Sequence, residues 1–480
     1  MEAVELLTLG TAIIVFLAIF RRGTRTRRPH HDRRAIRISD PAVARRALID
    51  HADGFSNRPM PPFPAGRPVT HGIASAPYGP FWRALRSNLA ADILRRSRLG
   101  VLEPLEREAT EALVAGLTSQ AVAGNGDSVV VPRNTIHSAV FALIARLCFG
   151  DDDAMDARVD LGAMVQTQQE FLESFVVTRA SPERSWLERL LLQRRRHAGI
   201  FDRVDDVFIP AVVAARRRRQ SSSQHDNGGG LRSHIDSLLE LHVPNNNNED
   251  DERARRLLTD QEVAFLVWEF LGGGTLSVVA CLEWTLAHLA AEPEIQSKLY
   301  HEAAGAHQDN EVSMAYDQQR LPYLHAVVTE SLRLHPPTPF ATRDVPADGI
   351  AAVALSEIGS AAPVSFVLGD IGRDRKAWTD PDEFRPERFL EGGQGEGVSL
   401  VPGPKTTEIK MMPFGAGRRH CPGVAMGMSH IKCFLAELVR GFEWAPPADG
   451  GGATDFAEVD GFRKMMKTPL RVRITPRSPM

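Results

Sequence analysis

A cysteine near the C-terminal end of the sequence stands among glycines and arginines. The segment reads Phe414-Gly-Ala-Gly-Arg-Arg-His-Cys421-Pro-Gly423, and an apolar pattern of helical spacing follows it from Val424 to Leu435. Glycines allow a backbone to approach a bound group closely. Backbone N–H groups at a helix start and nearby arginines stabilise an anionic sulfur. The segment therefore predicts a thiolate that binds the metal of a propionate-bearing cofactor.

Five positions of this segment match a known signature. Phe414, Gly417, Arg419, Cys421 and Gly423 are similar to the haem-binding signature FxxGxRxCxG of cytochrome P450. The resemblance implies that Cys421 is the axial ligand of haem b, iron protoporphyrin IX, where a thiolate pushes electron density that helps to cleave an O–O bond. A lone cysteine is otherwise most often a buried structural residue. The matching positions, together with further signatures upstream, favour the haem ligand.

A long apolar stretch precedes this segment by more than a hundred residues. Thr259-Asp-Gln-Glu262 is a capping box, and the residues from Val263 to about Leu289 are apolar nearly all round, which predicts a buried helix. Three consecutive glycines, Gly272 to Gly274, each cost a helix interior about 0.5–1 kcal/mol relative to alanine. They indicate either close helix packing or a locally loosened turn that leaves room for oxygen over the iron, and the resemblance favours the turn.

The resemblance places oxygen activation at Gly273, Gly274, Thr275 and Ser277, where the family pattern is (A/G)Gx(D/E)T(T/S). This chain has Leu276 at the acid position and keeps a hydroxyl, that of Ser277, at the alcohol position. In the family these two groups relay protons, and leucine has no ionisable group. We therefore predict slow or poorly coupled oxygen activation, with reducing equivalents lost as peroxide.

Two supporting sets of residues match the family. Glu330-Ser-Leu-Arg333 places opposite charges three residues apart on one helix face. The resemblance implies a buried network of Glu330, Arg333 and Arg388 beneath the haem. It also implies that Trp82, Arg86 and Arg419 hold the haem propionates through N–H donors and charge-assisted bonds. Taken alone, the charge pair would be an ordinary solvated pair, and Trp82 would be a core aromatic residue.

Composition excludes few function classes. The 480 residues are 43% hydrophobic and carry a formal net charge of −3, which gives no case for nucleic-acid binding. The four cysteines show neither a disulfide framework nor zinc-like spacing, which fits a reducing compartment.

The N-terminal residues differ from the rest of the chain. Val4 to Phe20 is apolar except for Glu5 and Thr residues, and five arginines follow between positions 21 and 28. We interpret residues 1–22 as a signal anchor, 23–35 as a basic linker and 36–480 as the haem-thiolate catalytic domain. The charge order predicts a single-pass protein of the endoplasmic reticulum membrane with a cytosolic catalytic domain. A buried core helix is the alternative for the apolar stretch.

The remaining chain predicts a mainly α protein, the cytochrome P450 fold with a minor β-rich part. A helix that starts with proline is expected at Pro41, and amphipathic helices are expected near 100–120, 135–148, 160–177 and 185–219. Two segments depart from the family. Compared with the family pattern, a few tens of residues are expected to be missing before Ile36, which would leave sheet edges unpaired. The sequence of the run Ile350–Pro363 does not match the hairpin that the family usually has there. Arg343 is the candidate propionate contact in this region, and its position is shifted relative to the family pattern.

The function implied is a haem-thiolate monooxygenase. It would insert one oxygen atom from O2 into an apolar small molecule, using electrons from NADPH through a membrane-bound NADPH–cytochrome P450 reductase. The amino-acid sequences of several segments, such as SAPYGPFWRALRSNL, are similar to those of plant A-type cytochromes of family 89 or 77. Two alternatives stay open: a non-oxidative haem-thiolate enzyme that rearranges a lipid hydroperoxide, and an inactive or degenerate family member.

Partner and substrate contacts are expected in two places. A cationic patch near the Cys loop would either receive the acidic reductase or serve only the haem and solvation; it comprises Arg418, Arg419, His420 and Lys432. The resemblance points to four pocket-lining segments: Ser75–Tyr78, Gln166–Val177, Thr338–Phe340 and Val459–Phe462. Their mixed, partly aromatic character suits a lipid-like or aromatic substrate.

Overall fold

The computed structural model describes most of the chain from Ile36 onward. The described ranges are 36–59, 69–95, 99–123, 129–150, 160–176, 186–221, 232–245, 254–308, 321–345, 362–447, 454–459, 461 and 463–477. The anchor and linker predicted for residues 1–35 lie outside these ranges.

Helix α9 (Asp260–Ala291) is the axis of the molecule. Thr259 and Glu262 form the predicted capping box, and most of the side chains along the helix are buried. The helix stays regular through Gly272–Gly274, so the predicted loosened turn is wrong: the buried turns on both sides of the glycines outweigh their low helix propensity. Among the described residues, α9 is the one helix long and apolar enough to cross a membrane, and 67% of its most apolar stretch is buried within the protein.

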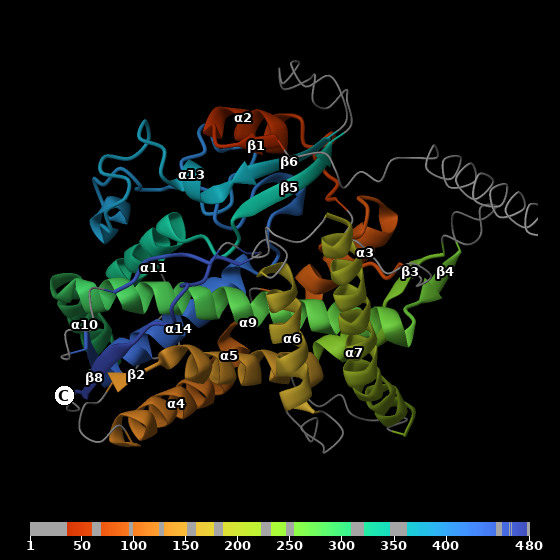
Figure 1. Ribbon diagram of the computed structural model, residues 1–480, viewed down its shortest axis with the longest axis horizontal. Coiled ribbons are helices and arrows are strands. Elements are labelled where there is room, and N and C mark those ends of the chain that lie inside the picture. The colour runs from red at the N-terminus through yellow and green to blue at the C-terminus, as the bar shows by residue number, and fades with distance from the viewer. Residues whose placement is uncertain are drawn as a thin grey trace, which may run out of the picture.

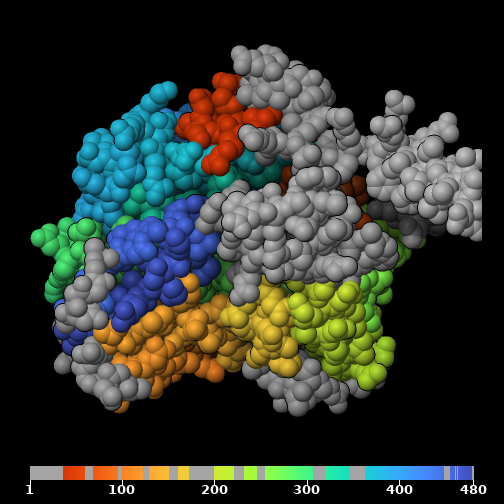
Figure 2. Space-filling view, viewed as in Figure 1, coloured from red at the N-terminus to blue at the C-terminus, as the bar shows by residue number. Residues whose placement is uncertain are grey.

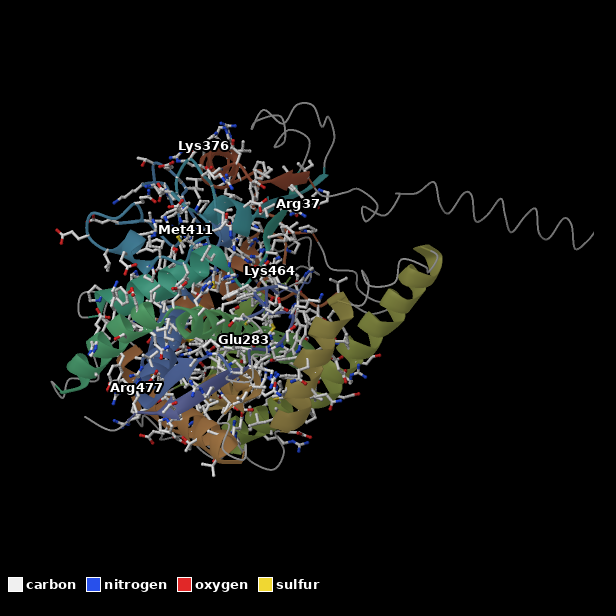
Figure 3. The ribbon with its side chains drawn as sticks, turned by 60° about the vertical axis from the view of Figure 1, so that its left-hand side comes forward. Arg37, Glu283, Lys376, Met411, Lys464 and Arg477 are labelled. Carbon is white, nitrogen blue, oxygen red and sulfur yellow. The ribbon has the colours of Figure 1, made fainter. Side chains whose placement is uncertain are left out.

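Other long helices pack around α9, as Figure 1 shows. Helices α4 and α5 lie below it, α11 lies above it, and α6 and α7 cross its other end. Glu283 of α9, labelled in the interior in Figure 3, pairs with Arg133 of α5 at 2.8 Å. The bounds of these helices are α4 (Leu99–Ala123), α5 (Pro132–Phe149), α6 (Leu161–Val176), α7 (Trp186–Ser221), α10 (Pro293–Gln308), α11 (Pro322–Leu334) and α14 (Val424–Gly441). The four amphipathic helices expected between residues 100 and 219 are confirmed.

Three small sheets complete the architecture. Strand β6 (Ala362–Val367) lies between β1 (Ile36–Ile38), its parallel partner, and β5 (Phe340–Val345), its antiparallel partner. The other sheets contain β2 (Val129–Val130), β8 (Val472–Pro476) and β7 (Phe442–Ala445), and the pair β3 (His242–Pro244) and β4 (Arg255–Leu257).

The expectation for the run Ile350–Pro363 falls mostly outside the described ranges. Its last two residues, Ala362 and Pro363, begin β6 and pair with Val345 and Asp344 of β5. Strand β1 pairs with β6 along its whole length and lies at one edge of this sheet as the structure describes it.

Short helical elements link these parts. Asp40 caps the proline-started helix α2 through the N–H groups of Ala42 and Val43, as the sequence predicts. The short elements are α2 (Pro41–Arg45), η2 (Arg46–Asp50), α3 (Pro80–Asn88), η3 (Leu89–Ile93), α8 (His234–Leu239), α13 (Leu368–Gly372), η7 (Pro386–Phe389) and η8 (Gly417–Arg419).

The buried apolar residues form two clusters. The larger one joins the long helices, and a smaller one packs the β1–β6–β5 sheet against α2 and the segment before Cys421. On the face shown in Figure 2, the orange α4–α5 region runs along the lower edge and the blue C-terminal residues lie directly above it. The Cys421 segment therefore joins the helical part to the sheet.

Candidate functional site

The loop that carries Cys421 is fixed by backbone contacts. The Cys421 N–H donates to the Phe414 carbonyl at 2.8 Å, and η8 turns the chain between them. Gly417 has φ +68°, and a Cβ there would lie 2.0 Å from the carbonyl oxygen of Leu48. Only glycine fits this position, because both the backbone conformation and the close approach exclude a side chain. The loop is thus docked directly on η2.

Burial is the main influence on the ionisation of the Cys421 thiol. Burial raises its pKa, while the Gly423 backbone N–H and the charges of Arg86, Arg463 and Arg58 lower it. Burial is the largest of these effects, so the protein alone favours the neutral thiol. A metal cation at the sulfur would reverse this balance, because metal binding deprotonates a coordinating thiol.

Arg419 reaches the segment before α3. It donates to the carbonyls of Ser56 (2.7 Å), Ile73 (3.2 Å) and Ala76 (2.6 Å), and its guanidinium lies 4.5 Å from the Trp82 ring centroid. The side chain is buried, and its pKa is lowered to about 10 by burial and by neighbouring arginines. Arg419 therefore ties the Cys loop to the 56–76 region.

Trp82 and Arg86, both of α3, lie beside this arginine. The Trp82 indole N–H donates to the Ile73 carbonyl at 3.1 Å, and Arg86 donates to the His420 carbonyl at 2.9 Å. The structure thus brings together the three residues expected to hold propionates. Trp82 has a single N–H, so contact with a propionate would require its bond to Ile73 to break.

Two further arginines lie beside Arg419: Arg58, which is partly exposed and donates to the Arg419 carbonyl at 3.1 Å, and the buried Arg343. Arg343 of β5 is 1% exposed; it donates to Thr342 and Ala416 carbonyls at 2.9 and 3.5 Å, and its Nε has no hydrogen-bond partner among the described residues. Its pKa is lowered to about 9 by burial and by the charges of Arg58 and Arg419. Arg58 was not predicted from the sequence. It precedes Pro59 and follows the turn after η2, and this position was the only available signal for it.

Glu269 of α9 supplies negative charge to this cluster. Its carboxylate accepts the backbone N–H groups of Ile73 (2.7 Å) and Ala74 (2.8 Å). Burial raises its pKa, and these bonds together with Arg58 and Arg419 lower it. Sequence reasoning also missed this residue. The available signal was an acid within the apolar part of the helix, where Glu269 and Glu283 are the two carboxylates, because a buried carboxylate needs partners.

One stripe of α9 is incompletely covered. Gly273 is exposed and Glu269, Phe270 and Ser277 are partly exposed, within a helix that is otherwise buried on both sides of them. These positions follow helical spacing and share one face. A Cβ on Gly273 would meet nothing within 4 Å. The face of α9 that carries Glu269, Gly273 and Ser277 is therefore only partly covered.

The other catalytic candidates on α9 differ in exposure. A Cβ on Gly274 would lie 3.2 Å from Ile144, so this glycine serves close packing against α5. Thr275 is fully buried and Leu276 is 6% exposed. Ser277 lies on the partly covered face, where its Oγ accepts a hydrogen bond from Arg463 at 3.1 Å. Of the three consecutive glycines, only Gly273 is exposed and has no atom within 4 Å of an added Cβ.

The residues present fit a haem. The crowded guanidinium groups of Arg58, Arg343 and Arg419 suit two propionates, as does the Nε of Arg343, which has no hydrogen-bond partner among the described residues. The Cys421 thiol suits an iron ligand.

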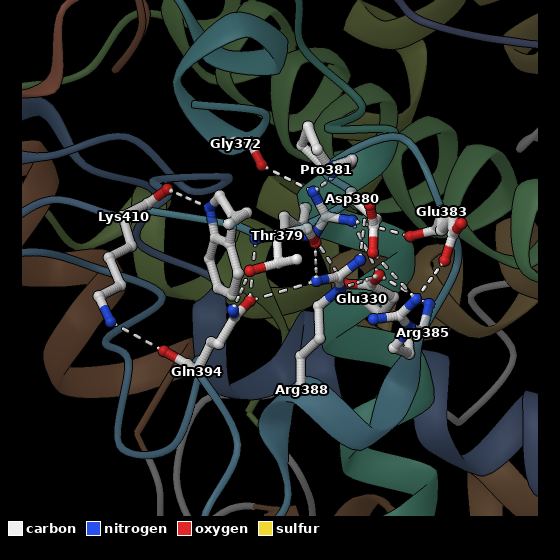
Figure 4. Close-up of polar contacts among 12 residues, drawn as sticks. Glu330, Gly372, Thr379, Asp380, Pro381, Glu383, Arg385, Arg388, Gln394 and Lys410 are labelled. Carbon is white, nitrogen blue, oxygen red and sulfur yellow. Dashed lines mark hydrogen bonds and ion pairs between the residues drawn. The ribbon is translucent and has the colours of Figure 1, made fainter. Parts of the chain in front are cut away.

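Glu330, Arg333 and Arg388 meet in a buried network (Figure 4). Glu330 pairs with Arg333 at 2.6 Å and with Arg388 at 3.3 Å, and none of the three is more than 4% exposed. Arg333 also donates to three carbonyls, those of Gly372, Pro381 and Glu383. The network pins the 372–388 segment to α11.

The expected cationic patch is wrong as a surface feature. Arg419 and Lys432 are only 4% and 6% exposed, because their charges are turned inward. Arg418 is exposed but contacts Asp53 and the Tyr78 hydroxyl. These residues therefore offer no continuous basic surface to an acidic partner.

Known proteins resemble this chain along most of its length. The sequence model of the family described as Cytochrome P450 matches residues 30–469. Cytochrome P450 89A9 of Arabidopsis thaliana is 32% identical, over 92% of this chain and 84% of that protein. Flavonoid 3'-monooxygenase CYP75B137 of Crocosmia x crocosmiiflora is 29% identical, over 92% and 83%. A trifunctional stylopine, nandinine and canadine synthase of Argemone mexicana is 28% identical, over 93% and 82%.

Proposed function

The chain belongs to the cytochrome P450 family, and on this premise we propose that it is a monooxygenase that inserts one oxygen atom from O2 into a small molecule with an apolar body. It is an oxidoreductase with the mostly helical fold of that family, and the family implies a haem cofactor. Haem with a thiolate ligand supplies the oxygen-activating chemistry when bound. The resemblance to plant cytochromes predicted from the sequence is confirmed.

One observation supports the proposal. Three arginines donate to consecutive parts of the Cys421 loop: Arg58 to the Arg419 carbonyl, Arg86 to the His420 carbonyl and Arg343 to the Ala416 carbonyl. The Nε of Arg343 has no hydrogen-bond partner among the described residues. We assign Cys421 as the metal ligand and Arg343, Arg419 and Arg58 as the propionate-binding residues, with Arg86 beside them. Phe414, Gly417 and Gly423 shape the ligand loop, and Trp82 packs under Arg419.

Two residues on the partly covered face of α9 would contact a group bound there. Gly273 leaves space, because a Cβ at this position would meet nothing within 4 Å. The Ser277 hydroxyl accepts a hydrogen bond from Arg463, so its own hydrogen can be donated to a bound group. Leu276 is buried and apolar, which supports poor proton delivery at this point. Electrons from NADPH through NADPH–cytochrome P450 reductase, and an anchor in the endoplasmic reticulum membrane, belong to the same proposal and rest on the resemblance.

The reduced, carbon-monoxide difference spectrum tests the proposal. We expect a red-shifted Soret band in the wild type and its loss in Cys421→Ser, with haem still detectable by its absorbance. Addition of reductase and NADPH should then give NADPH oxidation that depends on the haem. An unshifted band in the wild type contradicts the assignment of Cys421.

Hydroperoxide rearrangement is a second candidate function. The buried Leu276 favours it, because that chemistry needs neither external oxygen nor a proton relay from an acid at this position. Turnover of a lipid hydroperoxide without NADPH would distinguish it. A haem that binds with thiolate ligation but turns over neither substrate type would indicate an inactive family member.

A further inference from the structure

A small cavity lies where the β1–β6–β5 sheet meets two other parts of the chain. Its volume is about 120 Å³, close to that of cavities known to hold one benzene molecule. Its walls come from residues 334–340, 367–373 and 458–464, with Arg37 of β1 at the edge. Figure 3 labels Arg37 on β1 and Lys464 between the sheet and α9. No residue of α9 or of the Cys421 loop lines this cavity as the structure describes it, so it is separate from the proposed haem site.

One side of the cavity is apolar. The backbone there is already hydrogen-bonded: the Pro339 carbonyl accepts the Leu368 N–H at 3.0 Å, and the Pro337 carbonyl accepts the Lys464 N–H at 3.0 Å. Proline rings carry no N–H donor. This side therefore offers apolar surface to a ligand, and it comprises Leu334, Pro336, Pro339, Phe340 and Val367.

Two guanidinium groups border the apolar side. Arg37 is exposed, its Cζ lies 5.0 Å from the Phe340 ring centroid, and it forms no ion pair with any described residue. Arg373 forms one ion pair, from its Nε to Asp382 at 3.5 Å, and the Asp382 side chain is 71% exposed. Gly369 leaves space for this guanidinium, since a Cβ there would lie 3.3 Å from Arg373 Nη1. Both arginines thus keep N–H donors for a ligand.

The two carboxylates of the cavity differ in how far they are neutralised. Glu458 pairs with Lys464 and accepts a hydrogen bond from His335 Nδ1 at 3.3 Å, so its charge is balanced within the protein. Asp370 is exposed and accepts the Ser39 hydroxyl at 2.6 Å. With Glu458 and Lys464 paired, the two guanidinium groups outnumber the remaining carboxylate that lines the cavity.

We propose that this cavity is a second ligand site, which binds a small organic acid: a carboxylate on one aromatic or alicyclic ring. The ring lies on the apolar side beside Phe340, and the carboxylate faces Arg37 and Arg373. A guanidinium binds a carboxylate in planar, paired geometry. One six-membered ring matches the volume of the cavity. The site lies beyond the proposed monooxygenase function and does not depend on it.

Binding of matched fluorinated probes to the full-length, haem-loaded protein tests this site. The probes are 4-fluorobenzoate and the uncharged 4-fluorobenzamide, titrated while their fluorine NMR line widths are recorded in the reduced, carbon-monoxide-bound form. We expect the benzoate to bind at least about fivefold more tightly than the benzamide. Inorganic phosphate at equal concentration should not displace the benzoate, because it lacks the ring.

Charge variants of opposite sign locate the bound acid. Arg37→Gln and Arg373→Gln should each weaken the benzoate by about three- to tenfold and spare the benzamide. Asp370→Asn, which keeps an acceptor for Ser39, should tighten the benzoate by about two- to fivefold. Lys376→Gln is the control, since it removes an exposed cation that does not line the cavity. If Arg373→Gln does not fold, the exposed Arg37 decides.

Several results would overturn the site. They are equal binding of benzoate and benzamide to the wild type, displacement of the benzoate by equal phosphate, and the same affinity change in Arg37→Gln as in Lys376→Gln. Weaker binding of the benzoate to Asp370→Asn would also overturn it. A carbon-monoxide band without the red shift would reject Cys421 as the ligand and leave these expectations unchanged.

Discussion

The molecule contains two clusters of arginines that handle charge in opposite ways. In the Glu330 network all five N–H donors of Arg333 have acceptors, two on Glu330 and three on carbonyls. Around Cys421, by contrast, Arg343 makes two hydrogen bonds, its Nε has no partner among the described residues, and burial and the neighbouring guanidinium groups lower its pKa. The charges of the first cluster are paired within the protein, and the second is the cluster that we propose an anionic ligand completes.

Removal of Glu330 should have the largest effect, because it breaks the complete cluster. Glu330→Ala leaves Arg333 and Arg388 buried without their shared carboxylate, a cost of about 3–5 kcal/mol. We expect a strong loss of soluble protein and a lower unfolding temperature, measured by differential scanning fluorimetry. Arg385→Ala removes an exposed arginine nearby and should change little; similar losses in both variants would contradict the distinction.

Glu106 is a further buried ionisable group, and burial favours its protonated, uncharged form. Glu106 of α4 lies 3.4 Å from His430 of α14, and burial raises its pKa from 4.5 to about 7, with Ser429 lowering it and Glu103 raising it by smaller amounts. The folded state holds the proton more firmly, so its contribution to stability is complete below pH 4.5 and is lost as the pH rises through about 7.

Glu106→Gln should remove this pH dependence. Relative to the wild type, the variant should gain up to about 3 kcal/mol in unfolding free energy between pH 5 and pH 8. Urea unfolding at both values measures the difference, and comparison with the wild type cancels the opposite titration of His430. Parallel stability curves would show that Glu106 stays ionised in the folded protein.

Arg343→Met should show whether the arginines around Cys421 differ in function from those of the Glu330 network. In the haem-free protein it removes a buried cation from beside Arg58 and Arg419, so stability should rise or stay unchanged. In the loaded protein it removes a propionate donor, and haem should dissociate about tenfold faster. Haem transfer to apomyoglobin and urea unfolding measure the two forms.

The control for that prediction lies in the other cluster. Arg333→Met should destabilise the haem-free and loaded forms alike, because it strands Glu330 whether or not a ligand is bound. Opposite signs for Arg343→Met and equal signs for Arg333→Met support the comparison. A loss of haem-free stability in Arg343→Met would place Arg343 with the structural arginines.

The smallest effect is expected at Leu276. Leu276→Asp introduces an ionisable group beside Ser277 and should lower the peroxide released per NADPH consumed, by about two- to tenfold, which is less than full general acid catalysis provides. Leu276→Asn is the control, since it is polar but cannot relay a proton as an acid. An unchanged peroxide ratio, or a wild type that already releases none, would show that leucine does not limit proton delivery.

Sequence reasoning reached the parts of the site that local pattern encodes. The capping box at Thr259 and the Glu330–Arg333 pair follow from residue types at short spacing, and the ligand loop and Arg388 follow from the resemblance. Arg58, Glu269 and Arg463 carry no such pattern, because their partners lie 361, 196 and 186 residues away. The regular helix through Gly272–Gly274 could not be predicted either, since the buried turns on both sides override the low helix propensity of glycine.

The contact of Gly417 with Leu48 has a consequence for how the protein is made. The segment that we propose binds the cofactor emerges from the ribosome near the end of synthesis, yet it docks on a helix that emerged near the beginning. Strand β1 likewise pairs only with β6, its partner from the C-terminal half, among the described strands. At translation rates of about 5–20 residues per second, the early segments spend tens of seconds without these partners. On our assignment of Cys421, haem insertion is therefore a late event, because a chain that ends before residue 421 lacks the ligand.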